Sequence, residues 1–341
     1  MKKLLPFAKK YLNYSVIAIA AIIFSVLSLS GSLGMSDQLL LEKITIAIIL
    51  AVSLSMVVGF LGELSLGHAG FMCVGAFVGG KVAALLEPML GNGFPLLIVA
   101  MIVGSLTAAL FGIIIGLPAL RLRGDYLAIV TLAFGEIVRS VVMNVPATLF
   151  GGTLGLPTPR FSRKYLLIVG FVVVLACLAI TQNLIKSKHG RAITSIRDNE
   201  IAARAMGIDV TKYKLTVFTI SAFFAGLAGV IFSFSQNNLQ SSTFDYNYSI
   251  EILVMVVLGG MGSINGSIVA ATLITFLTVT LQKHLTGDLA VLQNLLYALI
   301  LIGIVIYKNA PGLKYFREKY NFRTVFSKKD KKTAEADAKE D

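Results

Sequence analysis

The chain has 341 residues, of which 56% are hydrophobic and only 14% are charged, and its mean hydropathy is +0.82. An ordinary soluble domain carries about 25% charged residues, and a single soluble core stops growing at about 250–300 residues. The composition therefore excludes an ordinary soluble protein. The net charge of +12 lies in short segments between apolar runs, which favours a membrane protein with basic loops over a nucleic-acid-binding protein.

The N-terminal segment carries four lysines between positions 2 and 10, ahead of an apolar run at 14–32. A signal peptide is one interpretation. We favour an uncleaved first helix, because no small-residue cleavage site follows and further apolar runs do. Cys73 and Cys177 both fall in apolar runs, which argues against a disulfide or a metal centre.

Ten apolar runs approach the length of about 20 residues that a helix needs to cross a bilayer. The sequence therefore predicts an all-α polytopic membrane protein. The helices are expected at 14–32, 43–61, 67–86, 95–117, 125–144, 165–182, 213–234, 248–260, 264–282 and 288–307. The third and eighth are short or rich in glycine, so each is a candidate for a broken or re-entrant element.

Basic residues collect on alternate connections. The connections at 33–42, 87–94 and 235–247 carry no Lys or Arg, whereas the segment 183–214 carries seven. The positive-inside rule then predicts cytoplasmic N- and C-termini. The exception is an outer loop with Arg160, Arg163 and Lys164. We expect a transmembrane domain at 1–307 and a basic, then acidic tail at 308–341, whose low apolar content predicts disorder.

Small residues repeat along single faces of three predicted helices. Spacing of three or four residues places such positions together, so that a neighbouring backbone can approach closely. The residues are Gly104, Ala108, Gly112 and Gly116; Gly67, Gly75 and Gly79; and Ala222, Gly226 and Gly229. General helix packing is the favoured interpretation, and a face that slides during transport is the alternative.

Charged residues inside predicted spans are few. Glu136 and Arg139 are three residues apart in the fifth helix and share a face, so they either pair or line a pathway. Glu63 and His68 flank the start of the third helix. They are candidates for a gate, although capping of that helix by Ser65 is the simpler interpretation.

The segment 183–214 is the longest polar stretch before the tail. Residues 191–197 favour a helix, and Asp198 or Asn199 can cap a second one at 200–206, ended by Gly207. Two short helices beside a membrane suit docking of a soluble partner. An amphipathic element lying on the membrane is the alternative, which the acidic residues Asp198, Glu200 and Asp209 disfavour.

A phosphate-loop pattern, GxxxxGK, occurs at 75–81 but is rejected. Val82 stands where such a loop needs a hydroxyl, and the pattern lies within a span. No local catalytic triad or carboxylate pair is visible in the sequence. We therefore expect no catalytic residues, no metal and no cofactor in this chain.

Four stretches together resemble permease subunits of ATP-binding cassette importers for branched-chain amino acids, closest to the longer, M-type subunit. They are GELSLGHAGFMCVGAF at 62–77, RLRGDYLAIVTLAFGEIVR at 121–139, HGRAITSIRDNEIAARAMGI at 189–208 and VLGGMGSINGSIVAA at 257–271. The resemblance implies the ten-helix fold of vitamin B12 importers and a bacterial plasma-membrane location. The loop FGGTLGLP at 150–157 departs from the family pattern at Leu154, which leaves the substrate open.

The resemblance also implies partners and site residues. Partners would be a homologous second permease, two ATPase subunits that use ATP and magnesium, an extracytoplasmic substrate-binding protein and membrane lipid, with no nucleic acid. ATPase coupling would involve Gly190, Arg191, Ala192, Ile196, Arg197, Asp198, Asn199, Ala202, Ala203, Met206 and Gly207. Candidates for the translocation path are Ser65, Gly67, His68, Gly70, Glu136, Arg139, Gly259, Gly260 and Gly262.

Three alternatives stay open. A urea or amide permease of the same type would share these motifs. An ion-coupled transporter would need carboxylates at the membrane midplane, for which Glu136 is the single strong candidate. A membrane-bound enzyme acting on lipids or isoprenoids would need acidic or histidine clusters, and the sequence offers none.

Overall fold

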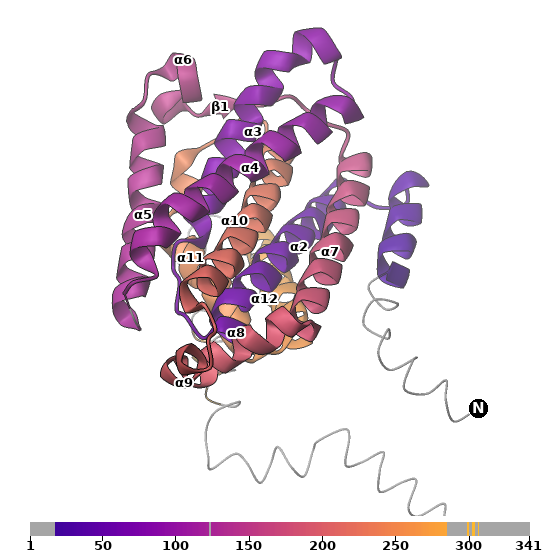
Figure 1. Cartoon of the computed structure of the whole chain (residues 1–341). Coiled ribbons are helices and arrows are strands. Elements are labelled where there is room, and N and C mark those ends of the chain that lie inside the picture. The colour runs from indigo at the N-terminus through magenta and orange to yellow at the C-terminus, as the bar shows by residue number, and fades with distance from the viewer. Residues whose placement is uncertain (1–17, 123, 285–298, 300–301, 304–305, 307–341) are drawn as a thin grey trace, which may run out of the picture. The chain divides into compact units, whose positions relative to one another are not determined.

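The computed structural model of the chain describes residues 18–122, 124–284, 299, 302–303 and 306 (Figure 1). The chain divides after Val279 into two units, 1–279 and 280–341. The predicted last span at 288–307 contains only four described residues, all helical. The predicted boundary at 307 and the tail at 308–341 lie outside the described residues.

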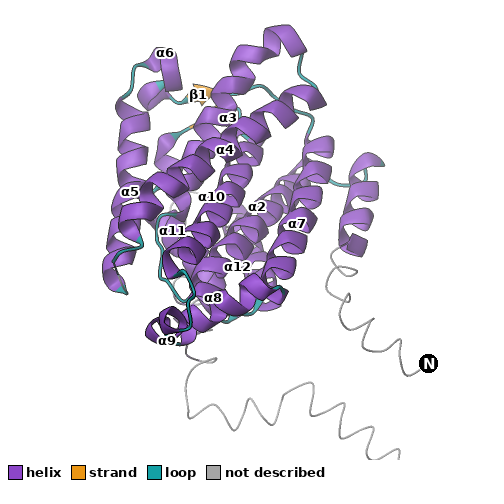
Figure 2. Cartoon of the chain, in the orientation of Figure 1, coloured by secondary structure: helices purple, strands orange, loops and turns teal. Residues whose placement is uncertain are grey.

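Helices make up almost all of the first unit (Figure 2). A helix at Ala18–Leu29 comes first. It is followed by α2 (Met35–Ser55), the π-helix η1 (Met56–Leu61), α3 (His68–Leu90), α4 (Phe94–Ala119), α5 (Asp125–Asn144), α6 (Ala147–Phe150), η2 (Gly152–Leu154), β1 (Leu156–Pro157), α7 (Arg163–Lys186), α8 (Lys188–Asp198), α9 (Glu200–Ala205), α10 (Val210–Ser235), β2 (Asn238–Leu239), η3 (Ser241–Phe244), α11 (Tyr246–Gly259) and α12 (Ile264–His284).

Seven of the described helices are long and apolar enough to cross a membrane: α2 with η1, α3, α4, α5, α7, α10 and α12. Each coincides with a predicted span, which confirms an all-α polytopic membrane protein. They differ in burial. The apolar window of α2 and η1 is 94% buried, whereas that of α4 is 28% buried. The first is therefore central in the unit, and most of the apolar window of α4 is not covered by this chain.

The first, third and eighth predicted spans differ from one another in the structure. Ala18–Leu29 is the helix in the described part of the predicted first span. The helix α11, with 14 residues, is about 21 Å long at 1.5 Å per residue, less than the roughly 30 Å hydrocarbon core. The predicted shortness of the eighth element is therefore confirmed. The third is a single 23-residue helix, α3, so it is not broken. The described residues do not contain the ten membrane-spanning helices that the sequence predicts.

Glycines allow the backbones of α3, α4 and α10 to approach one another closely. A Cβ on Gly75 in α3 would lie 2.4 Å from the Gly226 backbone in α10. A Cβ on Gly104 in α4 would lie 2.8 Å from the Gly75 oxygen, and one on Gly229 would lie 2.1 Å from the Met72 oxygen. The predicted small-residue faces are thus helix-packing surfaces within this chain.

Gly75→Ala is expected to destabilise the protein by about 1–3 kcal/mol, because the new methyl group would meet backbone atoms that cannot turn away. Gly135→Ala is the matched control in α5. Its added Cβ would be 3.7 Å from the nearest atom, so stability should be unchanged. Thermal unfolding of the purified variants measures the difference. Equal melting temperatures for Gly75→Ala and the wild type would contradict this packing.

Buried polar groups join α2, α3 and α10. The Ser53 hydroxyl lies 2.8 Å from Nε2 of His68, and the Ser221 hydroxyl donates to the Ser53 carbonyl oxygen at 2.7 Å. The prediction that Ser65 caps α3 is wrong. Gly67 occupies the cap position with no side-chain bond, and the Ser65 hydroxyl is buried without a partner. The chain leaves η1 through Gly62 at φ +80°, and α3 begins at His68, so Ser65 lies two residues before the cap position.

The glycine-rich loop at 150–157 lies at the end of the unit opposite α8 and α9 (Figure 1). It folds as the end of α6, η2 and β1, and β1 pairs antiparallel with β2 through Leu156 and Leu239. Thr158 donates to the carbonyl oxygens of Ser233 and Gln236 at 2.9 and 2.8 Å. Leu154 stays 80% exposed at the tip.

Candidate functional site

The segment between α7 and α10 folds as two short capped helices. The Ser187 hydroxyl accepts from the amides of His189 and Gly190 at the start of α8. Oδ1 of Asn199 accepts from the Ala202 amide at 3.0 Å at the start of α9. Gly207 follows with φ +82°. The predicted cap at Asn199 and stop at Gly207 are confirmed, although α9 ends at Ala205 rather than Met206.

The residues predicted for ATPase coupling fall into two sets. Gly190, Ile196 and Ala203 are buried and hold the segment against its own chain. A Cβ on Gly190 would meet the carbonyl group of Ile185 at 1.9 Å. Ala192 is half-buried. The exposed set is Arg191, Arg197, Asp198, Asn199, Ala202, Met206 and Gly207. Only this second set is open to a partner.

Two exposed apolar side chains stand out on this segment. Ile201 is 75% exposed in α9, and Met206 is 83% exposed directly after it. The exposed Arg204 lies between them in sequence and pairs with Glu200 at 3.0 Å. Sequence reasoning included Met206 but missed Ile201. We call Ile201, Arg204 and Met206 the α9 face.

Arg197 connects α8 to the π-helix η1 through a hydrogen bond. Its Nη1 donates to the Gly59 carbonyl oxygen at 3.2 Å, and its Nε and Nη2 donate to Oδ1 of Asp198 at 3.1 and 3.0 Å. A Cβ on Gly62 would lie 2.6 Å from Cγ of Arg197. Only glycine therefore leaves room for this side chain, which connects α8 to η1.

A buried lysine makes the second connection. Lys214 in the first turn of α10 is 3% exposed, and its Nζ contacts Oε1 of Glu63 and, at 3.2 Å, Oε2 of Glu200. Glu63 follows η1 and Glu200 begins α9. We call Lys214, Glu63 and Glu200 the charge cluster. It joins the start of α10, the loop before α3 and α9, and sequence reasoning did not pair these residues.

The turn between α11 and α12 packs on the same η1. Gly260 and Gly262 have φ of +97° and +81°. A Cβ on Gly59 would lie 2.5 Å from the Gly262 nitrogen, and one on Gly259 would lie 2.4 Å from the Gly266 backbone. Beside the turn, a pocket of about 300 Å³ is lined by residues of η1, the end of α7 and the start of α12. The glycines thus bring the turn, η1 and α8 together.

The predicted path residues near α3 are packed against other helices. A Cβ on Gly67 would lie 2.6 Å from the Thr131 oxygen, and one on Gly70 would lie 2.7 Å from Cα of Gly135. The Ala69 amide donates to the Ser249 hydroxyl at 3.2 Å. These contacts join α3 to α5 and α11. Whether a path forms here stays a prediction.

Glu136 and Arg139 form an ion pair within α5. Nε and Nη2 of Arg139 donate to Oε2 of Glu136 at 2.9 and 2.8 Å, and both side chains are about 30% exposed. The predicted pairing is confirmed. The pair neutralises both charges on a helix that crosses the membrane, which reduces the penalty for placing them there.

Seven apolar helices among the described residues, with a capped two-helix segment tied to their ends by charged side chains, define the class as a polytopic membrane protein. The family model described as "Branched-chain amino acid transport system / permease component" matches residues 38–307. The chain belongs to this family.

Curated relatives agree with the family assignment. The chain is 35% identical over 260 residues to the high-affinity branched-chain amino acid transport system permease protein LivM of Salmonella typhimurium, covering 67% of this chain and 60% of that protein. A probable LivM of Methanocaldococcus jannaschii is 26% identical over 76% of this chain and 88% of its own length. The ribose import permease protein RbsC of Haemophilus influenzae is 31% identical over 37% of this chain and 40% of its own length. No solved structure matches.

Proposed function

We propose that the chain is the transmembrane permease subunit of an ATP-binding cassette importer and forms half of a translocation path for branched-chain amino acids. One observation carries this proposal: a two-helix segment outside the spans is tied to their ends by Arg197 and the charge cluster. A docking segment built this way suits a chain that receives energy from a partner. ATP and magnesium would be used by two ATPase subunits.

The ATPase would dock on the exposed side of α8 and α9. The α9 face offers two apolar side chains beside Arg204, and exposed apolar groups with a polar rim are typical of protein interfaces. Arg191, Asp198, Asn199 and Ala202 would lie at its edge. Gly190, Ile196 and Ala203 support the segment from inside.

Movement of the docked segment would reach the membrane helices through two connections. Arg197 would carry it to η1, and η1 packs on the α11–α12 turn at Gly262. The charge cluster would carry it to α10 and to the loop before α3. Because packed elements shift between discrete arrangements, such a movement would open and close a path lined by residues near Gly67, Gly70, Gly259 and Gly260.

The position of the basic residues supports a cytoplasmic location for α8 and α9. Alternating helices place the α4–α5 turn, with Arg121, at the same end as α8 and α9 (Figure 1). Basic connections favour the cytoplasmic side, so both termini would be cytoplasmic. The complex would include a homologous second permease and, on the opposite side, a substrate-binding protein.

Uptake by a strain that depends on this chain tests the substrate. We expect unlabelled isoleucine and valine to reduce labelled leucine uptake strongly, and urea or ribose to leave it unchanged. The match to branched-chain amino acid permeases covers more of the chain than the match to the ribose permease. Inhibition by urea with no inhibition by valine would assign the chain to urea or amide transport instead.

A further inference from the structure

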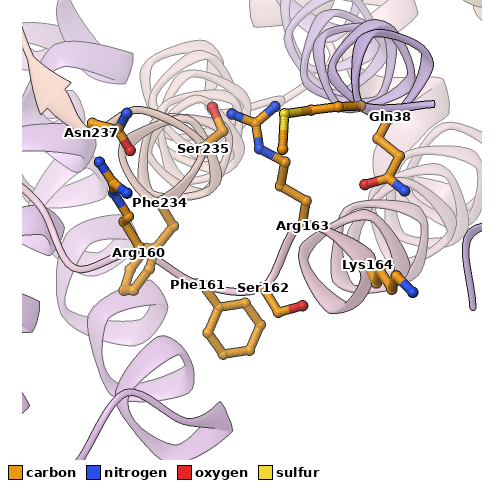
Figure 3. Close-up of a pocket in the computed structure, with 10 residues that line it drawn as sticks. Gln38, Arg160, Phe161, Ser162, Arg163, Lys164, Phe234, Ser235 and Asn237 are labelled. Atoms are coloured by element: carbon orange, nitrogen blue, oxygen red, sulfur yellow. The ribbon is translucent and has the colours of Figure 1, made fainter. Parts of the chain in front are cut away.

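A pocket of about 440 Å³ opens where α2 and α7 begin and α10 ends (Figure 3). These helix ends lie at the end of the first unit opposite α8 and α9 (Figure 1). Arg160, Arg163 and Lys164 all line it. The two arginine side chains run in the same direction on opposite walls, with Ser235 between them. Among the connections at this end of the first unit, the segment 160–164 is the one that carries Lys or Arg, since 33–42, 87–94 and 235–247 carry none.

The pocket lacks a negative charge of its own. None of the described residues that line it is acidic. The nearest buried acid is Glu42, one helical turn below Gln38 in α2, and Arg163 attracts it. The two are not hydrogen-bonded, however, because both Glu42 oxygens and Nη1 of Arg163 are buried without a partner. Arg163 therefore keeps an unused donor beside the pocket.

The surroundings place the pocket where the apolar spans end. The Phe94 ring packs against Phe161 at 5.3 Å and Tyr165 at 5.4 Å, and Phe161 packs against Phe234 at 6.3 Å. Phe161 and Phe234 also line the pocket. Tyr165 is partly exposed, and tyrosine is one of the residues that gather at the membrane–water interface. A ligand at this level lies among lipid headgroups, and phosphate is the headgroup anion that the two guanidinium groups match.

We propose that this pocket binds the phosphate group of a membrane phospholipid. The guanidinium groups of Arg160 and Arg163 donate charge-assisted hydrogen bonds to its oxygens, and Lys164 supplies a third positive charge. Exposed Met35 at the rim contacts the start of the acyl chains. The bound lipid then fills the gap between the ends of α2, α7 and α10.

Native mass spectrometry of the full-length protein, titrated with phosphatidylglycerol in detergent, tests this site. The wild type should bind a first lipid about tenfold more tightly than Arg160→Gln, because charge-assisted bonds to phosphate are lost. Arg160 is exposed, so this variant should fold. Arg121→Gln is the matched control, since it removes an exposed arginine at the opposite end and should bind like the wild type.

Inorganic phosphate, added in excess, distinguishes a lipid from a free anion. We expect it to leave the first lipid bound, because it lacks acyl chains. Equal lipid binding by Arg160→Gln and the wild type would overturn the proposal. Displacement of the lipid by this excess of phosphate would also overturn it, because that result would identify a free-anion site. Neither measurement depends on transport, so a failure here leaves the proposed function standing.

Discussion

Lys214→Met is expected to destabilise the protein and to abolish energised uptake. The substitution keeps the length and apolar stem of the side chain but removes the ammonium that lies between Glu63 and Glu200. Removing one partner of a buried ion pair costs about 3–5 kcal/mol. The lower end of this range applies, because Arg204 still pairs with Glu200. Thermal unfolding and leucine uptake measure the two effects.

Lys212→Met is the matched control for that substitution. Lys212 is exposed two residues earlier in α10, so its loss should change stability little. A second variant, Lys214→Met with Glu63→Gln, removes charge from both sides of the cluster and should recover part of the stability. If Lys214→Met were as stable and as active as Lys212→Met, the charge cluster would not connect α9 to the membrane helices.

Ile201→Asp with Met206→Asp is expected to remove ATPase binding without unfolding the chain. Both side chains are more than 70% exposed, so they contribute little to the fold. In a complex, each would be buried in the partner. A carboxylate placed there would be desolvated, and the neighbouring Arg204 is already paired with Glu200, so binding should weaken by several kcal/mol. Leu154→Asp is the control, because it adds a carboxylate at an equally exposed site at the opposite end.

Local features of the fold were predictable from the sequence. The seven long helices follow from runs of about 20 apolar residues, since lipid excludes charge over that length. The cap at Asn199 and the stop at Gly207 depend on side chains within three or four residues. Gly259 and Gly260 end α11, and these glycines were the sequence signal that this helix is short. Each of these features depends on residues within one helix or directly beside it.

Contacts between distant segments were not predictable. Lys214 and Glu63 are 151 positions apart, and nothing local pairs them. One signal was present: Lys214 lies on the same helical face as Val217, Phe218 and Ser221, which are buried. A cation on an apolar face needs a partner. Ile201 was missed because the side of α9 that packs inward, where Ala203 lies, depends on tertiary contacts.

Copurification of the ATPase subunits with the membrane complex tests the central claim most directly. The wild type and Leu154→Asp should retain the ATPase in detergent, whereas Ile201→Asp with Met206→Asp should lose it and lose ATP-dependent leucine uptake. All three proteins should have the same melting temperature. Full ATPase retention and uptake by the double variant would contradict docking on the α9 face, and leucine uptake driven by an ion gradient without ATP would contradict the importer itself.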